Sequence, residues 1–466
     1  MVDRRRVFKI IFCLFCLFIY GIGLGSVYGQ NESHSNLIDR KNHPNIIVIM
    51  VDDLGYGDIG AYNSTIDFTP HMDALAKKGR LFTDFHSNGP MCSPTRAAFL
   101  TGMYQYRFGQ RFEGALNASK KDEGFPVDEI TFPSLLQKAG YRTALFGKWH
   151  LGVESPYLPN NYGFDEFRGL LSGDGDHHSQ INRWGMEDWW HNDTLAMENG
   201  YSTELITRYS VDFIETYRDQ PFFLFISHIA IHFPWQGPDD PMHRKPSHNY
   251  EMDKWGIIPD ESNVRPHVEA MVQAVDESVG EVMKKLKALG LDEETLVILT
   301  SDNGGYYDYN QGSHSFENIS DNGPLRGQKT EVFEGGHRVP FIAHWPKMIN
   351  ANTRSEATTM TMDLFPTFMK VANISSNKMV DGIDIGPALV SDKGLEDRMV
   401  FWKKGADYAV RDKEWKFVFS DNQSYLFNLS TDIGEKENLL SIYPEMVQKL
   451  EKAYGEWRSN IEASLK

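Results

Sequence analysis

Residues 45–51 read Asn-Ile-Ile-Val-Ile-Met-Val and are followed directly by two aspartates, Asp52 and Asp53. An unbroken apolar run of this length, rich in β-branched residues, is typical of a strand that is buried on both faces. Such strands occur in sheets that helices cover on either side, so the run predicts a mostly parallel central sheet. Four more apolar runs extend the predicted sheet: residues 142–146, 222–227, 295–300 and 341–344.

Helical patterns lie between the predicted strands. Thr69 and Pro70 fit an N-cap followed by proline at the first helical position, and Gly79 fits the end of that helix. Residues 268–289 carry apolar side chains at helical spacing and predict an amphipathic helix. Strands that alternate with helices in this way indicate an α/β fold with helices on both faces of the sheet.

The N-terminal segment predicts export. Three arginines at 4–6 precede an apolar run at 7–24, and small residues follow at 26–30. This pattern is typical of a secretory signal peptide, although the run approaches the length of an uncleaved membrane anchor. Cleavage at about residue 30 would give a periplasmic or secreted protein that is not stably inserted in a membrane.

The sequence changes character at about residue 375. Residues 399–428 contain short aromatic-rich segments separated by turn residues, and a helical pattern runs from about Pro444 to Ala463. These patterns predict an antiparallel meander and a helix in a smaller C-terminal α+β subdomain. We therefore expect a signal peptide at 1–30, a catalytic domain at 31–375 and a C-terminal subdomain at 376–466.

Charge and cysteine content narrow the range of possible functions. The formal net charge of -17 argues against nucleic acid as a partner, although local positive charge could still bind an anionic substrate. Of the three cysteines, Cys13 and Cys16 lie in the predicted signal peptide, which leaves Cys92. A secreted protein with one thiol forms no internal disulfide, so Cys92 is either an inert core residue or a residue with a chemical role.

Polar residues follow four of the predicted strands. In doubly wound sheets ligands bind beyond the carboxyl ends of the strands, so these residues indicate a site, although single polar residues there are often turn formers. The oxygen ligands among them suit Ca²⁺ best and Mg²⁺ next, and a zinc site is less favoured. The residues are Asp52 and Asp53, Lys148 and His150, His228 and His232, and Asp302 and Asn303.

The segment around Cys92 reads Cys92-Ser93-Pro94-Thr95-Arg96 and leads into a helix-forming stretch. Ser93 as N-cap and Pro94 at the first helical position would place Cys92 at a helix N-terminus. Backbone N–H groups and the helix dipole favour an anion there. Arg96, one turn into the helix, could donate to the same anion.

Cys-x-Pro-x-Arg at 92–96, continued to Thr101-Gly102, resembles the modification signature of type I sulfatases in the alkaline phosphatase superfamily. The resemblance spans about residues 44 to 440 and implies an alkaline-phosphatase-like fold. Other segments that resemble the family's motifs are 51–55, 140–152, 301–304, Lys329 with 334–336, 415–416 and 425–429.

The resemblance also implies a mechanism. A maturation enzyme would convert Cys92 to formylglycine, whose hydrate attacks sulfur through one hydroxyl, activated by the metal and Asp302. The second hydroxyl would then expel the sulfate from the covalent ester. By position in the motifs, Ca²⁺ would be held by Asp52, Asp53, Asp302, Asn303 and the modified Cys92.

The remaining motif positions imply roles for charged side chains. Arg96 and Lys148 would steady the formylglycine and the sulfate, and Lys329 would contact the sulfate. His150 would help the diol to collapse, and His232 would protonate the leaving alcohol. The family's usual proline before this last histidine is Ile231 here, so His228 remains an alternative.

Loops beside the motifs suggest the substrate. His178, Arg183 and His314 lie in or beside Gly-rich loops and could bind a sugar. Together with predicted export, these polar, Trp-containing loops favour a sulfated carbohydrate, such as a polysaccharide, as the substrate. Two alternatives stay open: a phosphomonoester or phosphonate-ester hydrolase of the same superfamily, and a non-catalytic glycan-binding relative. The intact Cys92 and charged motif residues count against the second.

Overall fold

The structure is a computed structural model that describes residues 43–391 and 393–465. The predicted signal peptide at 1–30 lies outside these residues. In the described part of the chain, every helix is too short or too polar to span a lipid bilayer.

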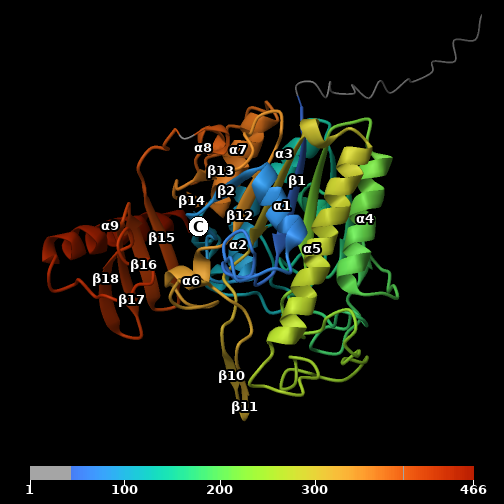
Figure 1. Cartoon of the computed structure of the whole chain (residues 1–466), viewed down its shortest axis with the longest axis horizontal. Coiled ribbons are helices and arrows are strands. Elements are labelled where there is room, and N and C mark those ends of the chain that lie inside the picture. The colour runs from blue at the N-terminus through green and yellow to red at the C-terminus, as the bar shows by residue number, and fades with distance from the viewer. Residues whose placement is uncertain (1–42, 392, 466) are drawn as a thin grey trace, which may run out of the picture. The chain divides into compact units, whose positions relative to one another are not determined.

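A ten-stranded sheet lies at the centre of the larger, N-terminal part of the described chain (Figure 1). In spatial order its strands are β13 (Thr353–Ser355), β2 (Arg80–Phe82), β12 (Phe341–His344), β9 (Thr295–Ser301), β1 (Asn45–Val51), β8 (Phe222–His228), β4 (Arg142–Gly147), β5 (Glu166–Gly169), β6 (Trp190–His191) and β7 (Thr194–Leu195). The neighbours β9, β1, β8, β4 and β5 run parallel to one another. β12 runs antiparallel to both β9 and β2. The predicted mostly parallel sheet is confirmed.

The apolar runs became the central strands because both of their faces are covered. β1, β8 and β9 are buried over their full length. Alternate residues of β1 belong to two different cores: Ile47 and Ile49 to one, and Ile46 and Val48 to the other. In a strand that faces two apolar layers, apolar residues do not alternate with polar ones. The continuous apolar run in the sequence has this pattern.

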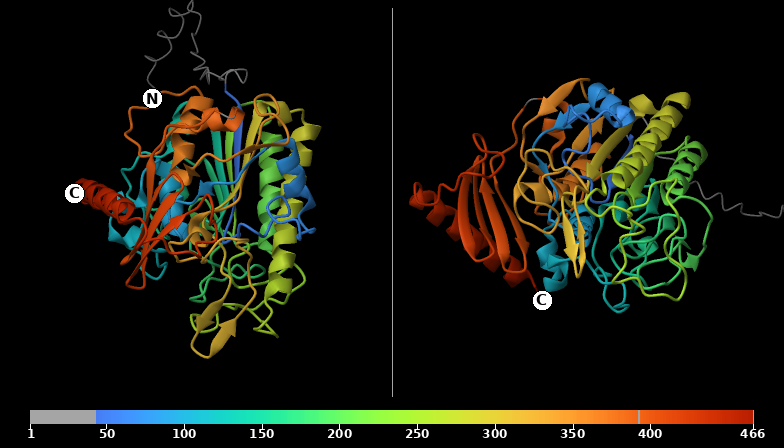
Figure 2. Two further views of the ribbon diagram at one scale, coloured as in Figure 1. Left: turned by 60° about the vertical axis from the view of Figure 1, so that its left-hand side comes forward. Right: turned by 60° about the horizontal axis from the view of Figure 1, so that its bottom comes forward.

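Helices cover both faces of the sheet (Figures 1 and 2). One layer shares its core with Ile47 and Ile49, and the other shares its core with Ile46 and Val48. The first layer consists of α1 (Pro70–Lys78), α4 (Ser202–Thr216) and α5 (Arg265–Ala288), and the second of α2 (Cys92–Thr101), α3 (Phe132–Lys138) and α7 (Leu364–Val371). The predicted helices at 70–78 and 268–289 are confirmed, and the second begins three residues earlier than expected, at Arg265.

The C-terminal part is an antiparallel sheet with one long helix. The strands β15 (Met399–Lys404), β16 (Asp407–Asp412), β17 (Trp415–Ser420) and β18 (Gln423–Asn428) pair in chain order, and α9 (Pro444–Ser464) packs on β16 and β17. The predicted meander and helix are confirmed. This part is joined to the N-terminal part through buried contacts, among them a hydrogen bond from Trp402 Nε1 to the carbonyl oxygen of Ser87 at 2.9 Å. Shorter elements are β3 (Phe85–His86), β14 (Thr359–Met360), β10 (Tyr309–Gln311), β11 (His314–Phe316), α6 (Glu334–His337) and α8 (Gly386–Val390).

Candidate active site

The polar residues that follow the central strands meet at one edge of the sheet. β9, β1, β8 and β4 are successive neighbours, so their carboxyl ends lie side by side. The side chains of Asp52, Lys148 and Asp302 that follow these strands are fully buried. Potential ligand atoms of Asp52, Cys92 and Asp302 all lie within 4.8 Å of one another. The structure thus brings together strand ends that are far apart in the sequence.

The backbone around these strand ends is tightly constrained. Gly147 has a φ of 112°, and a Cβ on it would lie 1.8 Å from the carbonyl oxygen of Ser227. Only glycine permits this approach, which places Lys148 beside β8. Asp53 and His150 adopt left-handed φ values of 63° and 59°. Non-glycine residues held in this region store strain, and such residues cluster at functional sites.

Cys92 occupies the first position of α2. The expectation that Ser93 caps this helix was wrong, because the N-cap is Met91 and the helix includes Cys92 itself. The Ser93 hydroxyl instead accepts a hydrogen bond from the backbone N–H of Leu116 at 3.0 Å. Pro94 is tolerated at the third helical position because the first turn has no N–H groups bonded within the helix. Cys92 nevertheless lies at the helix N-terminus, as expected.

His150 lies directly against Cys92. Its Nδ1 is 3.2 Å from Cys92 Sγ, and its Nε2 is 3.0 Å from the carbonyl oxygen of Leu116. A carbonyl can only accept a hydrogen bond, so Nε2 carries the proton and the neutral ring presents an unprotonated Nδ1 to Cys92. Burial, and next the charge of Lys148, hold the pKa of His150 well below its usual range. His150 is therefore a neutral proton acceptor at residue 92.

Arg96 orients the groups around Cys92. It donates from Nε and Nη2 to Asp302 Oδ2 at 3.0 and 2.8 Å. Its Nη1 donates to the carbonyl oxygen of Lys148 at 2.8 Å and to Ser227 Oγ at 2.6 Å. These bonds tie α2 to the ends of β9, β4 and β8, so Arg96 fixes the positions of Asp302 and Lys148.

Two lysines pair with the two aspartates that follow β1. Lys148 Nζ lies 2.5 Å from Asp52 Oδ2, and Lys329 Nζ lies 2.5 Å from Asp53 Oδ1. Asn303 also donates to Asp53 Oδ1, at 2.8 Å. Burial and the charge of Asp302 raise the pKa of Asp52 well above its usual range, and Lys148 opposes this shift. The cluster thus places three carboxylates beside three cationic side chains in a largely buried site.

The donor set fits a hard divalent cation. Among the described residues, Asp52 Oδ1 and Asn303 Oδ1 are buried oxygens without a hydrogen-bond partner. Buried polar atoms are rarely left unsatisfied, and these two oxygens lie beside further carboxylates that could bind the same cation. Carboxylate and amide oxygens are the ligands that Ca²⁺ and Mg²⁺ prefer.

His232 and His228 occupy different surroundings. His232 lines a cavity above Cys92; its Nδ1 lies 2.9 Å from the carbonyl oxygen of Phe233, and its Nε2 lies 4.0 Å from Asp53 Oδ2. His228 is fully buried, does not line the cavity, and within the described chain neither ring nitrogen has a hydrogen-bond partner. Of the two, His232 is the histidine that a substrate in the cavity can reach.

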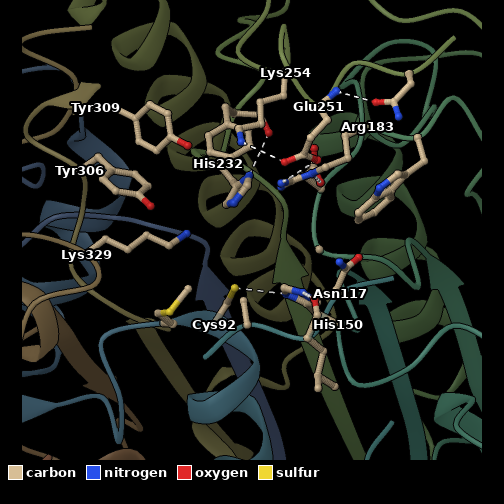
Figure 3. A pocket seen from close by; sticks show the side chains of 18 residues that line it. Cys92, Asn117, His150, Arg183, His232, Glu251, Lys254, Tyr306, Tyr309 and Lys329 are labelled. Atoms are coloured by element: carbon tan, nitrogen blue, oxygen red, sulfur yellow. Dashed lines mark hydrogen bonds and ion pairs between the residues drawn. The ribbon is translucent and has the colours of Figure 1, made fainter. Parts of the chain in front are cut away.

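The cavity has a volume of about 420 Å³ and is drawn in Figure 3. Cys92 and His150 lie at one end, and Arg183, Glu251 and Lys254 lie at the other. His232, Lys329, Tyr306 and Tyr309 line the space between. Phe233 and Trp184 also line the cavity. A volume of this size falls in the range of small-molecule sites and exceeds that of a single sulfate group.

The substrate-binding residues expected from the sequence are only partly brought together. Arg183 lines the cavity. His178 and His314 do not: His178 Nε2 lies 3.2 Å from the carbonyl oxygen of Gly237, and His314 Nδ1 lies 2.7 Å from Glu261 Oε1. Sequence reasoning missed the cavity residues Asn117, Glu251, Lys254, Tyr306 and Tyr309. Tyr306 directly follows the Asn303-Gly304-Gly305 motif, and Tyr309 lies three residues further on, so a signal was present for both. Lys254 lies in a loop without a recognisable pattern.

His228 gives a prediction about acid stability. Burial lowers its pKa to about 3, against roughly 6.5 in an unfolded chain. The unfolded state therefore binds more protons below pH 6.5, and the free energy of unfolding falls as the pH falls. We expect His228→Leu to reduce this loss of unfolding free energy between pH 6.5 and 4.5 by roughly 2 kcal/mol, as measured by urea titrations. His191→Gln, at an exposed histidine, should leave the loss unchanged. Equal pH slopes for the His228 variant and the wild type would refute the assignment.

Comparisons with known proteins give concordant results. A family model described as Sulfatase matches residues 44–374, and one described as N-sulphoglucosamine sulphohydrolase, C-terminal, matches residues 328–459. The N-acetylgalactosamine-6-sulfatase of Mus musculus is 33% identical over 384 residues, which cover 78% of this chain and 69% of that protein. Arylsulfatase A of Bos taurus is 30% identical over 467 residues, which cover 88% of this chain and 86% of that protein.

Two solved structures are similar over most of their length. The crystal structure of Ps i-CgsB matches with a TM-score of 0.78 and 30% identity, and the match covers 89% of this chain and 92% of that one. A further structure shows Ps i-CgsB in complex with k-i-k-neocarrahexaose. The PsFucS1 sulfatase from Pseudoalteromonas sp. matches with a TM-score of 0.72 and 27% identity, covering 91% of each chain.

Proposed function

Since the chain belongs to the sulfatase family and is a sulfuric ester hydrolase, we propose that its substrate is a sulfated carbohydrate, a polysaccharide or its oligosaccharides. The observation that carries the proposal is the cavity, whose closed end is formed by Cys92 and whose wall holds Lys329 and His232. The space beyond these residues is large enough for a sugar. The similarity to a structure with a bound neocarrahexaose supports the same substrate class.

We propose that Asp52, Asp53, Asp302 and Asn303, with the modified Cys92, hold Ca²⁺, and that Mg²⁺ is the second choice. The formylglycine made from Cys92 by a maturation enzyme would supply the nucleophile as its hydrate, and the cation would offset negative charge at the sulfate. The two unpartnered oxygens of Asp52 and Asn303 support this assignment.

The side chains around residue 92 would bind and orient the sulfate. Lys148 and Lys329 bring fixed positive charge to the site, where it acts in a closed, low-dielectric environment. Arg96 keeps Asp302 and Lys148 in place through its hydrogen bonds. His150, with Nδ1 unprotonated, would accept a proton from the group at position 92 when the sulfate is released.

His232 would donate a proton to the leaving alcohol. Burial, and then the charges of Lys329 and Lys148, hold its pKa well below the usual range, so the ring is neutral in the free protein. An anionic sulfate beside the ring would favour the protonated form and raise this pKa. Because Nδ1 is engaged by the carbonyl oxygen of Phe233, the transferable proton would be on Nε2.

If His232 rather than His228 is the proton donor, the effect of replacing it on kcat/KM should depend on the leaving group of the substrate. His232→Gln should lower kcat/KM for a sugar sulfate by about 10²- to 10⁴-fold, because an alkoxide leaves poorly without a proton. The loss should be much smaller for a nitrophenyl sulfate, whose leaving group needs little protonation. His228→Leu should change neither substrate in this selective way. A selective loss in the His228 variant instead would assign the role to His228.

The remaining expectations from the sequence are also part of this proposal. We propose a catalytic domain at 31–375, a C-terminal subdomain at 376–466, and export to the periplasm or beyond after removal of residues 1–30. The family model for the C-terminal region begins at residue 328, so it overlaps the proposed boundary.

The proposal is tested by sulfate release from a panel of sulfated mono- and oligosaccharides, with the matching phosphate esters as controls. We expect at least one sulfated sugar to be turned over faster than a small aryl sulfate and far faster than its phosphate analogue. Faster turnover of the phosphate esters would support a phosphoester hydrolase of the same superfamily and overturn the proposal.

A further inference from the structure

We propose that the end of the cavity opposite Cys92 is a subsite for a second anionic group, a sulfate or carboxylate, carried by the sugar substrate. Lys254 and Arg183 are the residues that would bind this group (Figure 3). The inference rests on the proposed function, since it specifies which sulfated sugars the site accepts.

Lys254 is a buried cation whose charge is only weakly compensated by a neighbouring carboxylate. It is 5% exposed, and its Nζ lies over the rings of Phe233 and Tyr309 at 5.7 and 5.8 Å. In the described part of the chain its one ion-pair partner is Glu251, whose Oε1 is 3.4 Å away. The Glu251 side chain is 44% exposed, so this pairing is long and open to solvent. A desolvated ammonium group held so weakly can gain substantially from an anion in the cavity.

Arg183 adds a second, partly free cation. Its Nε donates to Asp174 Oδ1 at 2.7 Å, and its Nη1 is 3.8 Å from Glu251 Oε2, beyond hydrogen-bond distance. Among the described residues, neither terminal nitrogen of Arg183 has a hydrogen-bond acceptor. The guanidinium lies over Trp184 and Phe233 at 5.5 and 5.2 Å, so aromatic contacts fix its plane. A planar guanidinium with two unengaged terminal nitrogens matches the oxygens of a sulfate or carboxylate.

The carboxylates at this end of the cavity compensate Arg183 and Lys254 only in part. Asp174 is shared by Arg183 and the fully buried Arg244, whose Nη2 lies 2.8 Å from Asp174 Oδ2. Burial alone would raise the pKa of Asp174, but the two arginines lower it to about 2, so it is ionised at neutral pH. Asp176, a second buried carboxylate near Arg244, further compensates that arginine. Of the cations that line the cavity, Arg183 shares Asp174 with Arg244, and Lys254 has the solvent-exposed Glu251 as its partner. Both of these cations lie at the end of the cavity away from Cys92.

A sugar whose sulfate ester reaches Cys92 would extend toward this end, because the cavity continues there past His232 and Tyr309. The anion-binding groups could then contact a second substituent on the same sugar or on its neighbour. An alternative is that Lys254 only anchors its loop through Glu251 and the aromatic rings. The two roles differ in their dependence on the substrate.

The experiment compares Lys254→Met and Arg183→Gln with the wild type on matched substrates. These are a monosulfated sugar, the same sugar with a second sulfate, its uronate counterpart, and a small aryl sulfate. Met keeps the apolar stem of Lys254 over the rings and removes only the charge. Lys245→Met, at an exposed lysine on the same segment and outside the cavity, is the control and should behave as the wild type.

We expect the wild type to prefer one of the doubly anionic sugars. On that sugar each variant should lose about 10- to 100-fold in kcat/KM, mainly through a higher KM. A loss of this size corresponds to one charge-assisted hydrogen bond. The preferred sugar identifies the anion as sulfate or carboxylate. The monosulfated sugar and the aryl sulfate should lose far less. Equal losses on all substrates, or no wild-type preference for a second anion, would overturn the subsite. If the wild type cleaves no sulfate ester at all, the proposed function itself fails and the subsite with it.

Discussion

Cys92→Ala should abolish sulfate release, with a loss of at least about 10⁴-fold in kcat, as expected when a covalent nucleophile is removed. Cys92 lies at the first position of α2, with His150 Nδ1 at 3.2 Å and the carboxylates of Asp52 and Asp302 close by. No other thiol lies among the described residues. Initial rates on a sulfated oligosaccharide and on an aryl sulfate are the measurement.

The fold should survive this substitution. Cys92 is 1% exposed, and truncating a small buried side chain to alanine costs about 1–2 kcal/mol, or a few degrees in Tm for a domain of this size. A thermal melt close to that of the wild type would therefore separate lost chemistry from lost structure. Substantial sulfate release by a folded Cys92→Ala variant would refute a mechanism that begins at this residue.

The second large effect is expected at the proposed cation site. Asp302→Asn should lower kcat by at least about 10³-fold, because it removes a charged ligand and the partner of Arg96 while keeping the side-chain shape. Chelation should inactivate the wild type, and Ca²⁺ should restore it better than Mg²⁺. The measurement is activity across a Ca²⁺ titration after treatment with a chelator.

Thermal stability gives a readout that does not depend on turnover. Ca²⁺ at 100 times its Kd should stabilise the wild type by about 2.7 kcal/mol, and this gain should be strongly reduced in Asp302→Asn. Asp193→Asn, at an exposed aspartate, is the matched control and should keep the full gain. An equal rise in Tm with Ca²⁺ in Asp302→Asn would show that the cation binds elsewhere.

The sheet was predictable because its central strands are buried on both faces. β1 and β12 coincide with the predicted ranges, and β4, β8 and β9 are each one residue longer than expected. The predicted alkaline-phosphatase-like architecture is confirmed, with sulfatases as the similar solved structures. The short edge strands β5, β6, β7 and β13 were not anticipated, since two to four residues are too few to show a period.

The start of α2 shows a limit of the local rules for helix capping. Serine followed by proline suggested an N-cap and first position, but Ser93 bonds to the distant backbone of Leu116. Proline fits anywhere in the first turn, because those N–H groups have no partner within the helix. The sequence could not distinguish positions one and three, and a tertiary contact decided between them.

The site likewise contains residues that could be predicted from the sequence and residues that depend on tertiary contacts. The aspartates, Lys148 and His150 near Cys92 could be predicted because they follow strands, and the ends of neighbouring parallel strands meet. Arg96 was anticipated from the segment that begins α2, and Lys329 from the resemblance to the family's motifs. The far wall of the cavity is built from loops that carry Arg183, Glu251 and Lys254. Loops have no period, so which of their side chains reach the cavity depends on the tertiary fold. For this reason Arg183 was anticipated, Lys254 was missed, and His178 and His314 were expected in a cavity that they do not line.

The most direct test of the central claim is the mass of the tryptic peptide that spans residues 81–96, measured on preparations of known specific activity. Conversion of Cys92 to formylglycine would lower this mass by about 18 Da relative to the thiol form. The proposed mechanism predicts that specific sulfatase activity is proportional to the converted fraction and extrapolates to zero for the pure thiol. Full activity in a preparation that carries only the unmodified thiol would contradict it.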